Sequence, residues 1–282
     1  MGVSLVITSW NSKELLKKNL PGVLAAFENR NNKIKEIIVV DDFSSDGSVA
    51  FLKESYPQVK VVEHRRNFGY GATCNSGVKN AAGELVAILN ADVVPSKNFL
   101  VSALPHFDDN QVFSVTFNEG KFGPGKLVWK DGFLEIQPTS ISQRTVSTDW
   151  PNGGSSVFRK SFWLKLGGMD ALFLPFYFED VDLGLRARKA GYKCLWEPAS
   201  KVVHEHQATI NPQKFADYKH KKNISLIKER NFLLLTWKNL TRPSEFLNHL
   251  RGLLKRVFSH PGYLKVVSSA SLRKIRSGFG HE

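Results

Sequence analysis

Three short apolar runs in the first third of the chain each end in polar or acidic residues. The runs cover residues 3–7, 37–40 and 85–89, and the residues that follow them are 8–11, 41–42 and 90–92. A continuous apolar run of this length, rich in Val and Ile, predicts a parallel strand covered on both faces. Ligands of open α/β sheets bind outside the carboxyl ends of such strands. The pattern therefore predicts one acidic crevice.

The remaining segments predict helices and strands in alternation. A helix is expected over residues 12–29, interrupted near Pro21, because proline is better placed at the start of a second helical piece than inside one. Further helices are predicted over 49–55, 72–82, 159–166 and 179–190, further strands over 59–62, 112–117 and 201–204, and loops and hairpins over 121–150. Helices between strands at this spacing imply parallel crossovers. The expected fold is α/β, with a mostly parallel sheet flanked by helices.

The charge of the chain is concentrated in its last quarter. The 282 residues are 42% hydrophobic and carry a net charge of +13. Residues 213–282 hold 15 lysines and arginines against four acidic residues, so this part supplies +11 and the first 212 residues only +2. We therefore expect a catalytic body over 1–212 and a basic helical extension over 213–282.

Targeting and redox features predict a cytoplasmic protein. The N-terminus enters a strand directly, and no run of about 18 uncharged apolar residues is present. Cys74 and Cys194 form no disulfide framework and have no metal-ligand spacing, so a reducing compartment is expected. Peripheral attachment to the inner face of the cell membrane is the alternative.

Two phosphate-binding motifs are missing. No glycine follows the first strand, where a dinucleotide fold needs a G-x-G-x-x-G turn, so hydride transfer is not expected. Residues 120–126, GKFGPGK, imitate a phosphate loop. Leu127 stands where that loop needs a magnesium-binding Ser or Thr, and Pro124 removes a backbone amide, so this interpretation is rejected.

Asp42 and Asp92 each allow two interpretations. Asp42 either binds a ligand at the end of its strand or forms an Asx turn into the serines that follow. Asp92, two residues after Asn90, either offers an oxygen ligand to Mg²⁺ or Mn²⁺ on a diphosphate or caps the next turn. His204 ends a later strand; a lone histidine in an apolar setting is more often structural, whereas beside a metal diphosphate it is a candidate ligand.

The predicted helix over residues 179–190 divides its charges between two faces. One face carries Glu179, Asp182, Arg186 and Lys189, and the opposite stripe carries Asp180, Leu183, Ala187 and Ala190. The first face is interpreted as salt-bridged surface, with Asp182 and Arg186 paired four residues apart. The stripe with Asp180 must face the core or a cleft, where partial burial raises the pKa of a carboxylate toward a value useful to a general base. Asp180 is therefore the strongest catalytic candidate.

Several ordered motifs between residues 3 and 206 resemble one known family. Residues 39–48 (VVDDFSSDGS) look like a nucleotide-binding turn, 67–77 like a glycine-containing nucleotide segment, and 89–92 (LNAD) like a metal-binding DxD motif whose first Asp is replaced by Asn90. Residues 152–159 and 166–170 resemble a donor-sugar and acceptor segment, and 178–182 (FEDVD) an acceptor-base motif. Together they resemble the family 2 glycosyltransferases of the GT-A fold, which transfer a sugar from a nucleotide diphosphate donor with inversion.

The resemblance implies roles for individual residues, with 1–92 as the nucleotide-binding half and 93–212 as the donor-sugar and acceptor half. The implied nucleotide-binding residues are Thr8, Trp10, Asn11, Asp42, Asn67, Gly69, Asn75 and Ala91. The implied donor-sugar or acceptor residues are Asn152, Gly153 and Gly154. Asp180 falls in the base position, and Asp92 with His204 would hold Mn²⁺ or Mg²⁺. Glu179 and Asp182 are candidates for orienting the base or the acceptor, with an ordinary surface pair as the alternative.

The resemblance also implies an activity and its partners. The membrane helices and the Q-x-x-R-W motif of processive polysaccharide synthases are missing, which favours single additions in cell-surface polysaccharide or glycolipid synthesis. The expected partners are a nucleotide-diphosphate sugar and a glycan or lipid-linked acceptor. The alternative is a nucleotide-sugar-binding or scaffold protein on the same fold with weak or no turnover.

Residues 246–258 of the extension predict an amphipathic helix. Its apolar stripe consists of Phe246, Leu247, Leu250, Leu253, Leu254, Val257 and Phe258, and its other faces carry His249, Arg251, Lys255 and Arg256. The stripe either packs on the catalytic body or, with the basic clusters at 219–222 and 273–276, attaches to an anionic membrane surface. Nucleic acid is not expected as a partner, because no recognised binding module accompanies the charge.

Overall fold

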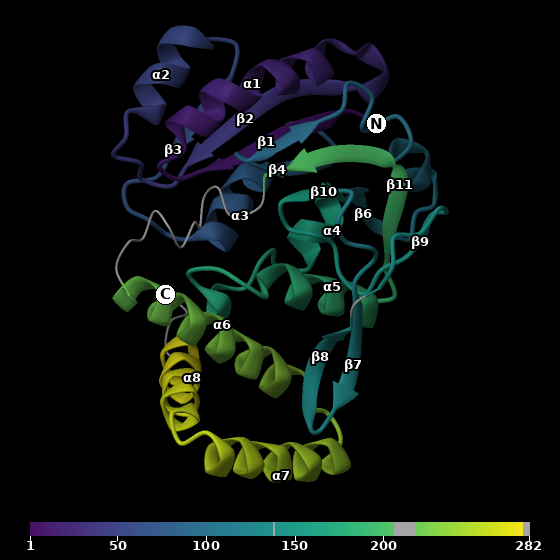
Figure 1. Cartoon of the computed structure of the whole chain (residues 1–282). Helices are drawn as coiled ribbons and strands as arrows, with labels where there is room; N and C mark the ends of the chain where they lie inside the picture. The colour runs from purple at the N-terminus through teal and green to yellow at the C-terminus, as the bar shows by residue number, and fades with distance from the viewer. Residues whose placement is uncertain (138, 206–217, 279–282) are drawn as a thin grey trace.

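The structure, a computed structural model, describes residues 1–137, 139–205 and 218–278, with the side chains of 218–222 and 278 not described. The strands of the central sheet are β1 (Val3–Ser9), β2 (Ile34–Asp41), β3 (Lys60–Glu63), β4 (Leu85–Asn90), β5 (Val93–Pro95), β6 (Val112–Asn118), β9 (Val146–Ser147), β10 (Ser155–Arg159) and β11 (Lys193–His204). They lie in the order β3-β2-β1-β4-β10-β6-β11-β5, and β9 pairs with β11 (Figure 1).

Eight helices and one hairpin surround this sheet in the described parts of the chain. The helices are α1 (Lys13–Glu28), α2 (Ser48–Ser55), α3 (Tyr70–Asn80), α4 (Lys160–Lys165), α5 (Glu179–Lys189), α6 (Tyr218–Asn239), α7 (Pro243–Ser259) and α8 (Tyr263–Gly278). The hairpin joins β7 (Lys126–Lys130) to β8 (Phe133–Gln137). In Figure 1, α6, α7 and α8 lie below the sheet, and the hairpin lies beside α6 and above one end of α7.

Strand direction decides which ends of the strands meet. β1, β2, β3 and β4 are parallel to one another, β10 is antiparallel to both β4 and β6, and β6 is parallel to β11. The carboxyl ends of β1, β2, β4, β6 and β11 therefore lie at one edge of the sheet, where β10 begins. The predicted crevice belongs at this edge.

The two faces of the sheet bury separate cores. Because successive strand residues point to opposite faces, Leu5 packs in a cluster with Leu16 of α1, whereas Val6 packs in a cluster with Val78 of α3 and Leu183 of α5. Helices α1 and α2 thus cover one face, and α3, α4 and α5 the other. The predicted α/β fold is confirmed.

Two expectations about secondary structure are wrong. Helix α1 continues through Pro21; Pro21 and Lys17, whose carbonyl loses its helical partner, are both exposed, so water can take the place of the missing bond. Residues 155–159 form a central strand that the sequence did not predict, because Ser155 and Ser156 interrupt its apolar pattern. Both serines are fully buried between β4 and β6.

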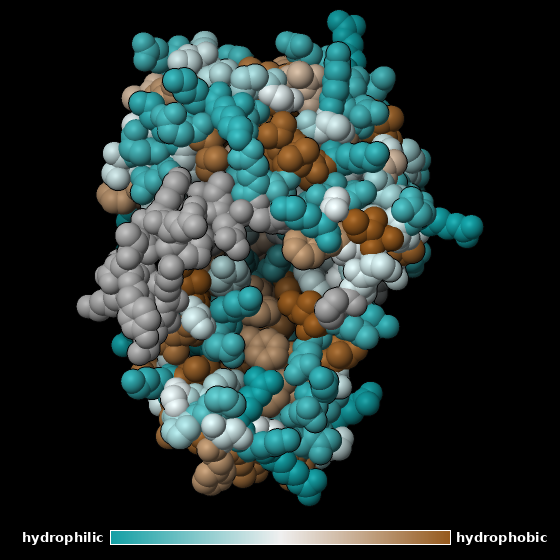
Figure 2. All heavy atoms as spheres, in the orientation of Figure 1, coloured by the Kyte–Doolittle hydropathy of each residue, from teal (hydrophilic) through white to brown (hydrophobic). Residues whose placement is uncertain are grey.

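The C-terminal helices share a third core with the body. Its buried members are Phe133, Leu134, Phe173, Phe178, Val181, Leu233, Leu234, Leu235, Val266 and Ala270. α6 and α8 therefore pack on the hairpin and on the segment that leads into α5. The predicted division at residue 212 lies outside the described residues. Figure 2 shows apolar side chains among hydrophilic ones at the lower end of the molecule, where Figure 1 places α7.

Candidate active site

Polar side chains from four distant parts of the sequence meet at the common edge of the sheet. Asn90 ends β4, Glu119 follows β6, His204 ends β11, and residues 152–154 precede β10. The backbone amide of Asn90 donates to the carbonyl of Gly154 at 3.0 Å, which joins the first half of the chain to the second. The sheet edge at which the crevice is expected thus carries residues of both halves.

His204 lies between two carboxylates. Its Nδ1 is 2.9 Å from Glu119 Oε1 and its Nε2 is 3.3 Å from Asp92 Oδ1, and the three side chains are almost fully buried. Burial alone lowers the pKa of His204, but the contacts with Asp92 and Glu119 outweigh it and raise the pKa to about 9. Without a bound metal ion the imidazolium therefore balances the buried acids at neutral pH, and a cation bound at Nε2 would replace the proton there.

The Asp92–His204 pair fits a divalent cation in part. Asp92 Oδ1 is buried and accepts no hydrogen bond of good geometry from the described residues, so one acidic oxygen remains available beside an imidazole nitrogen. Within the described ranges, no group of three or more His, Cys, Asp or Glu side chains could hold a metal ion by itself. Two protein ligands completed by substrate phosphates are typical of Mg²⁺ and Mn²⁺ sites that bind a nucleotide.

The turn over residues 152–154 connects this pair to the predicted base. Asn152 Nδ2 donates to Glu119 Oε1 at 2.7 Å, and the backbone amide of Gly153 donates to Asp180 Oδ2 at 3.1 Å. A Cβ on Gly154 would lie 2.3 Å from Asn90 Nδ2, so only glycine fits there without a shift. The predicted donor-sugar segment therefore lies between Asp92 and Asp180.

Asp180 is partly buried at the start of α5. Its Oδ1 accepts from its neighbour's amide, Val181 N, at 2.8 Å, and its Oδ2 accepts from Gly153. Burial raises the pKa of Asp180, and the two amide hydrogen bonds offset only part of that effect. A carboxylate held by backbone amides, with a raised pKa, suits a general base.

The two faces of α5 differ from expectation in one respect. Leu183 and Ala187 are buried as predicted, while Ala190, just past the helix end, is exposed. The salt-bridged surface expected on the other face is wrong, because Glu179 is 5% and Asp182 only 1% exposed. α5 is covered by the first turn of α3 on one side and by α6 on the other.

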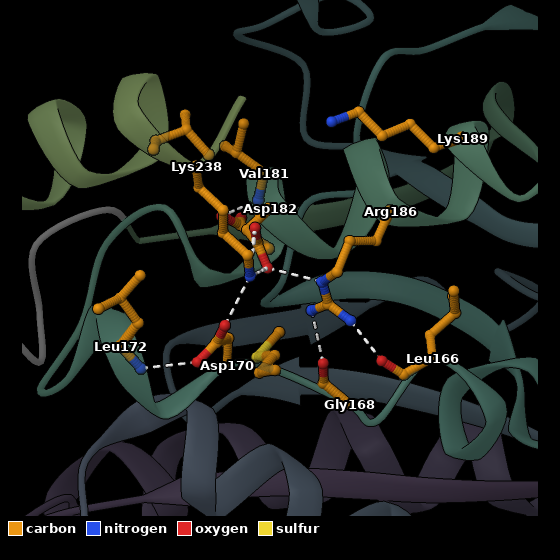
Figure 3. Close-up of polar contacts among 12 residues, drawn as sticks. Leu166, Gly168, Asp170, Leu172, Val181, Asp182, Arg186, Lys189 and Lys238 are labelled. Atoms are coloured by element: carbon orange, nitrogen blue, oxygen red, sulfur yellow. Dashed lines mark hydrogen bonds and ion pairs between the residues drawn. The ribbon is translucent and has the colours of Figure 1, made fainter. Parts of the chain in front are cut away.

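Asp182 binds the C-terminal helices rather than lining the crevice. It pairs with Arg186 as predicted, at 2.7 Å, and with Lys238 of α6, at 2.9 Å. Lys238 also pairs with Asp170, and Arg186 donates to the carbonyls of Leu166 and Gly168 (Figure 3). Lys189 lies outside this network, and its Nζ donates a hydrogen bond to Asn239 Oδ1. These contacts make Asp182 a link between α5 and α6.

Glu179 is buried beside the base. Within the described residues its Oε2 has no hydrogen-bond partner. Burial, together with the nearby charge of Asp180, raises the pKa of Glu179 well above its ordinary value. Both effects favour the protonated carboxyl group.

Asp42 is held by three donors at the end of β2. Its Oδ1 accepts from Phe68 N at 2.9 Å and contacts His64 Nδ1 at 2.7 Å, and its Oδ2 accepts from Gly69 N at 2.8 Å. The Asx turn considered for Asp42 is made instead by Asp41, whose carboxylate accepts from the amide and hydroxyl of the serine at 44. Asp42 thus fixes the segment that enters α3.

The same contacts produce an Asp-His-Ser chain, since His64 Nε2 lies 2.8 Å from Ser76 Oγ. Ser76 is in the interior of α3, where the backbone amides are used by the helix. The helix therefore offers this hydroxyl no free backbone amide of its own for an oxyanion, and acyl transfer by Asp42, His64 and Ser76 is not expected.

The other predicted nucleotide-binding residues lie along the same sheet edge. Thr8 Oγ1 donates to Asn90 Oδ1 at 3.2 Å, and Asn11, with φ 48°, accepts from the amide of the serine at 45. Trp10 is half-buried and Asn67 is exposed. Ala91 is buried, and its carbonyl accepts from Asn19.

Asn75 has structural contacts that occupy its side chain. Its Oδ1 accepts from Trp163 Nε1 at 3.1 Å and from Met169 N at 2.9 Å, and its Nδ2 donates to the carbonyl of Met169. The amide thereby holds the 166–170 segment against α3.

Glu119 and His64 were not predicted from the sequence. Glu119 follows β6, a strand that was predicted. Polar residues that follow parallel strands line the crevice, but the sequence did not show that β6 is parallel to β4, because that direction depends on the unpredicted β10 between them. His64 carries no local signal.

Comparison with known proteins decides the family. Residues 4–163, more than half of the chain, match the family described as Glycosyl transferase family 2. The chain belongs to this family. The predicted membership and the GT-A-type α/β fold are confirmed. The relatives differ widely in length.

Two curated relatives, both from Mycobacterium tuberculosis, illustrate that range. A pre-mycofactocin glycosyltransferase is 29% identical over 187 residues, which cover 62% of this chain and 38% of the relative. An N-acetylglucosaminyl-diphospho-decaprenol L-rhamnosyltransferase is 24% identical over 255 residues, covering 76% of this chain and 81% of the relative. The chain thus spans about two fifths of the first relative's length.

Two solved structures share the fold. GalNAc-T7 with UDP, GalNAc and Mn²⁺ superposes with a TM-score of 0.62 and 16% identity, covering 83% of this chain and 47% of that one. The mannosyltransferase PcManGT from Pyrobaculum calidifontis, in complex with GDP-Man and Mn²⁺, gives a TM-score of 0.59 and 16% identity, covering 99% and 76%.

Proposed function

We propose that this protein is an inverting glycosyltransferase that moves a sugar from a nucleotide-diphosphate donor to an acceptor hydroxyl in single additions. The observation that supports this most is the position of the 152–154 turn. It bonds to Asp180 through Gly153 and, through Asn152 and Glu119, to the Asp92–His204 pair. A carboxylate base and a diphosphate site are thus held at opposite ends of one turn.

Asp180 acts as the base in this proposal. Its carboxylate takes the proton of the acceptor hydroxyl, the acceptor oxygen forms a bond to the anomeric carbon, and the bond from that carbon to the diphosphate oxygen breaks. The nucleoside diphosphate leaves with the bonding electrons. One in-line displacement inverts the anomeric configuration.

Asp92 and His204 would hold Mn²⁺ or Mg²⁺ together with oxygens of the donor. A divalent cation there neutralises the charge that develops on the diphosphate as it leaves. Two of the solved structures that share the fold were determined with Mn²⁺. Glu119, which accepts from Asn152 and contacts His204, keeps the imidazole in place.

The nucleotide would occupy the ends of β1 and β2. Asp42, positioned by His64 and by the amides of residues 68 and 69, faces the base in this proposal, with Thr8, Trp10, Asn11 and Asn67 around it. Asn75, within α3, holds the 166–170 segment against that helix. The relatives named above include an enzyme whose name specifies a lipid diphosphate acceptor, which favours a glycan or lipid-linked acceptor here.

Release of nucleoside diphosphate from UDP-, GDP- and dTDP-sugars tests the activity. Wild type would be assayed with Mn²⁺, Mg²⁺ or EDTA beside Asp180→Asn and Asp92→Ala, with Asp109→Asn, on a partly exposed ion pair distant from the crevice, as the matched control. We expect metal-dependent release from one donor, reduced at least ~100-fold in the first two variants and unchanged in the control.

The alternative is a nucleotide-sugar-binding protein without turnover. Calorimetry with the same nucleotides separates the two functions, because metal-dependent binding without release from any donor favours the binding protein. Absence of both binding and release contradicts the transferase proposal.

We further propose that α7 docks on an anionic membrane surface. Five residues of its apolar stripe have side chains that are 44% to 81% exposed: Phe246, Leu247, Leu250, Leu254 and Phe258. Arg251 and Lys255 border this stripe and are also exposed. α8 adds the exposed apolar residues Leu264, Leu272 and Ile275 and the exposed basic residues Lys265, Lys274 and Arg276. A basic amphipathic helix of this kind is attracted to anionic lipid, whereas a second copy of the chain would bring an equally basic surface against it. We therefore favour a membrane over a second copy as the partner of α7.

The face of α7 that contacts the body is not the predicted one. His249, assigned to a polar face, is only 4% exposed and bonds to Trp237 Nε1 and to the carbonyl of Gly132. Among the described helices none is long and apolar enough to cross a membrane. The side chains of 219–222 lie outside the described residues.

Sedimentation with vesicles tests this surface. We expect wild type to pellet with phosphatidylcholine–phosphatidylglycerol vesicles but not with phosphatidylcholine alone, and Leu250→Glu with Phe258→Glu to abolish pelleting. Val101→Glu, at an exposed apolar residue far from α7 in the sequence, is the control. A protein that stays in the supernatant, or a dimer in light scattering that Leu250→Glu dissociates, contradicts the proposal.

A further inference from the structure

The turn that delivers Asp180 has an unusual backbone. Tyr177 and Phe178, the residues just before α5, have φ angles of 77° and 73°. Bulky side chains rarely adopt the left-handed region, and two in succession persist only where the surroundings hold them. Such outliers are typical of functional sites, and this one lies directly before the proposed base.

A buried asparagine of the C-terminal extension holds this turn. Asn231 of α6 is fully buried, and its Nδ2 lies 2.5 Å from the carbonyl oxygen of Phe173, 2.8 Å from that of Phe176 and 3.1 Å from that of Tyr177. Its Oδ1 accepts from Arg230 Nε at 2.9 Å. The carbonyls of a turn of this shape lie outside helix and sheet bonding, so a buried donor is needed to satisfy them.

The position of Asn231 indicates a specific role. Leu233, Leu234 and Leu235 follow it in the same helix and are buried in the third core. An apolar side chain would suit that core equally well, whereas an unpaired amide there would be costly. The three carbonyls of the 173–177 segment account for the asparagine.

Other residues of the extension bind the same segment. Arg230 donates to the carbonyl of Leu174, and Arg273 of α8 donates to the carbonyls of Ala171 and Leu172. Lys238 joins Asp170 to Asp182. α6 and α8 therefore fix both sides of the turn that ends in Asp180.

We propose that Asn231 is a positioning residue for the base: it holds the left-handed turn at 177–178 and thereby orients Asp180 toward Gly153 and the acceptor. This inference rests on the proposed function in giving Asp180 the role of base. It makes the C-terminal extension a part of the catalytic apparatus.

Full-length Asn231→Leu keeps the number and branching of the side-chain heavy atoms and removes the donors, so it tests this role. Asn231→Ser is the milder variant for measurement if the first does not fold. The donor is the one that wild type consumes in the panel above. We expect kcat to fall at least tenfold with little change in the KM for the donor. The acid limb of the pH profile should move toward lower pH, because a released Asp180 carboxylate is better solvated and burial no longer raises its pKa as far.

Thr236→Val is the matched control. Thr236 is a fully buried residue of the same helix, and its hydroxyl donates to the carbonyl of Phe232 within α6 and to no other group of the described residues. It should keep the kcat and the pH profile of wild type at a comparable melting temperature. An equal loss in this control would show a general effect of weakening α6 and would overturn the inference.

Amide hydrogen exchange at Gly153 gives a readout that needs no substrate. That amide bonds to Asp180 Oδ2 and does not touch Asn231. We expect exchange at least tenfold faster in Asn231→Leu and unchanged in Thr236→Val. Wild-type kcat and wild-type exchange at Gly153 in the Asn231 variants would overturn the inference. If wild type consumes no donor, the proposed function fails, and the exchange measurement alone decides whether Asn231 positions Asp180.

Discussion

Asp180 Oδ2 accepts a hydrogen bond from the backbone amide of Gly153 at 3.1 Å, although 27 positions of the sequence separate the two residues. The same turn continues through Asn152 to Glu119, and Glu119 contacts His204. The proposed base and the proposed metal ligands therefore belong to one connected set of hydrogen bonds. A substitution at one end should therefore change the properties of the residues at the other end.

Glu119→Gln should weaken metal binding without touching Asp92. Glutamine keeps an acceptor for Asn152 but removes the negative charge that faces His204. Loss of such an outer partner typically costs about 10–100-fold in metal affinity. Titration calorimetry with Mn²⁺ and UDP measures this, with Glu135→Gln on the hairpin as control. An unchanged Mn²⁺ affinity would contradict the connection.

Gly154→Ala should reduce activity through Asn90. The added Cβ would lie 2.3 Å from Asn90 Nδ2, so the asparagine or the turn must move. We expect kcat/KM to fall by about tenfold or more, equivalent to about 1.4 kcal/mol of transition-state stabilisation. Gly262→Ala is the control, since a Cβ there meets nothing within 4 Å. Equal kinetics in the two variants would count against a role for this close approach.

Glu179→Gln should stabilise the protein at neutral pH. The pKa of Glu179 is raised in the folded state, so its contribution to stability is fully present below pH 4.5 and is lost as the pH rises toward the raised value. Glutamine keeps the neutral form at every pH. We expect a gain of about 1–2 kcal/mol in urea unfolding at pH 7.5 and almost none near pH 4. Glu84→Gln, at an exposed residue, should leave the stability unchanged at both pH values. A gain from Glu179→Gln that is the same at both pH values would refute the link between stability and the pKa of Glu179.

The packing of α7 should weaken in mild acid because of His249. Its Nε2 accepts from Trp237 Nε1 and its Nδ1 contacts the carbonyl of Gly132, so only the neutral ring satisfies both. Burial lowers the pKa of His249. The stability it contributes is therefore present above about pH 6.5, the ordinary value for histidine, and is lost as the pH falls toward the lowered pKa.

Urea unfolding at pH 7.5 and pH 5.5 measures this effect. We expect His249 to account for a loss of about 1 kcal/mol between the two pH values, and His249→Gln to abolish that difference. His260→Gln, at the exposed end of α7, should retain it. If His249→Gln keeps the full pH dependence, another group is responsible.

Much of the N-terminal half could be predicted from local patterns. The runs at 3–7, 37–40 and 85–89 are strands because their apolar residues are buried on both faces, and the polar residues after them lie at one edge. Asp92, Asp180 and His204 were named as candidates from the sequence, and the structure places Asp92 beside His204. The second half was harder, because β10 carries serines at its buried positions and Glu119 becomes a site residue only once β6 is oriented by β10.

The sequence by itself determined the family, the order of strands and helices in the first ninety residues, and the types of side chain available for the chemistry, because these depend on short-range periodicity and on motifs. Tertiary structure alone decided that the Glu179 and Asp182 face of α5 is buried as well, and which face of α7 is buried. It also decided that Asn231 lies against the turn before Asp180. Those features depend on contacts between residues far apart in the chain, such as Asn231 with Tyr177 and Gly153 with Asp180, and local sequence carries no record of which distant partner a buried polar group will meet.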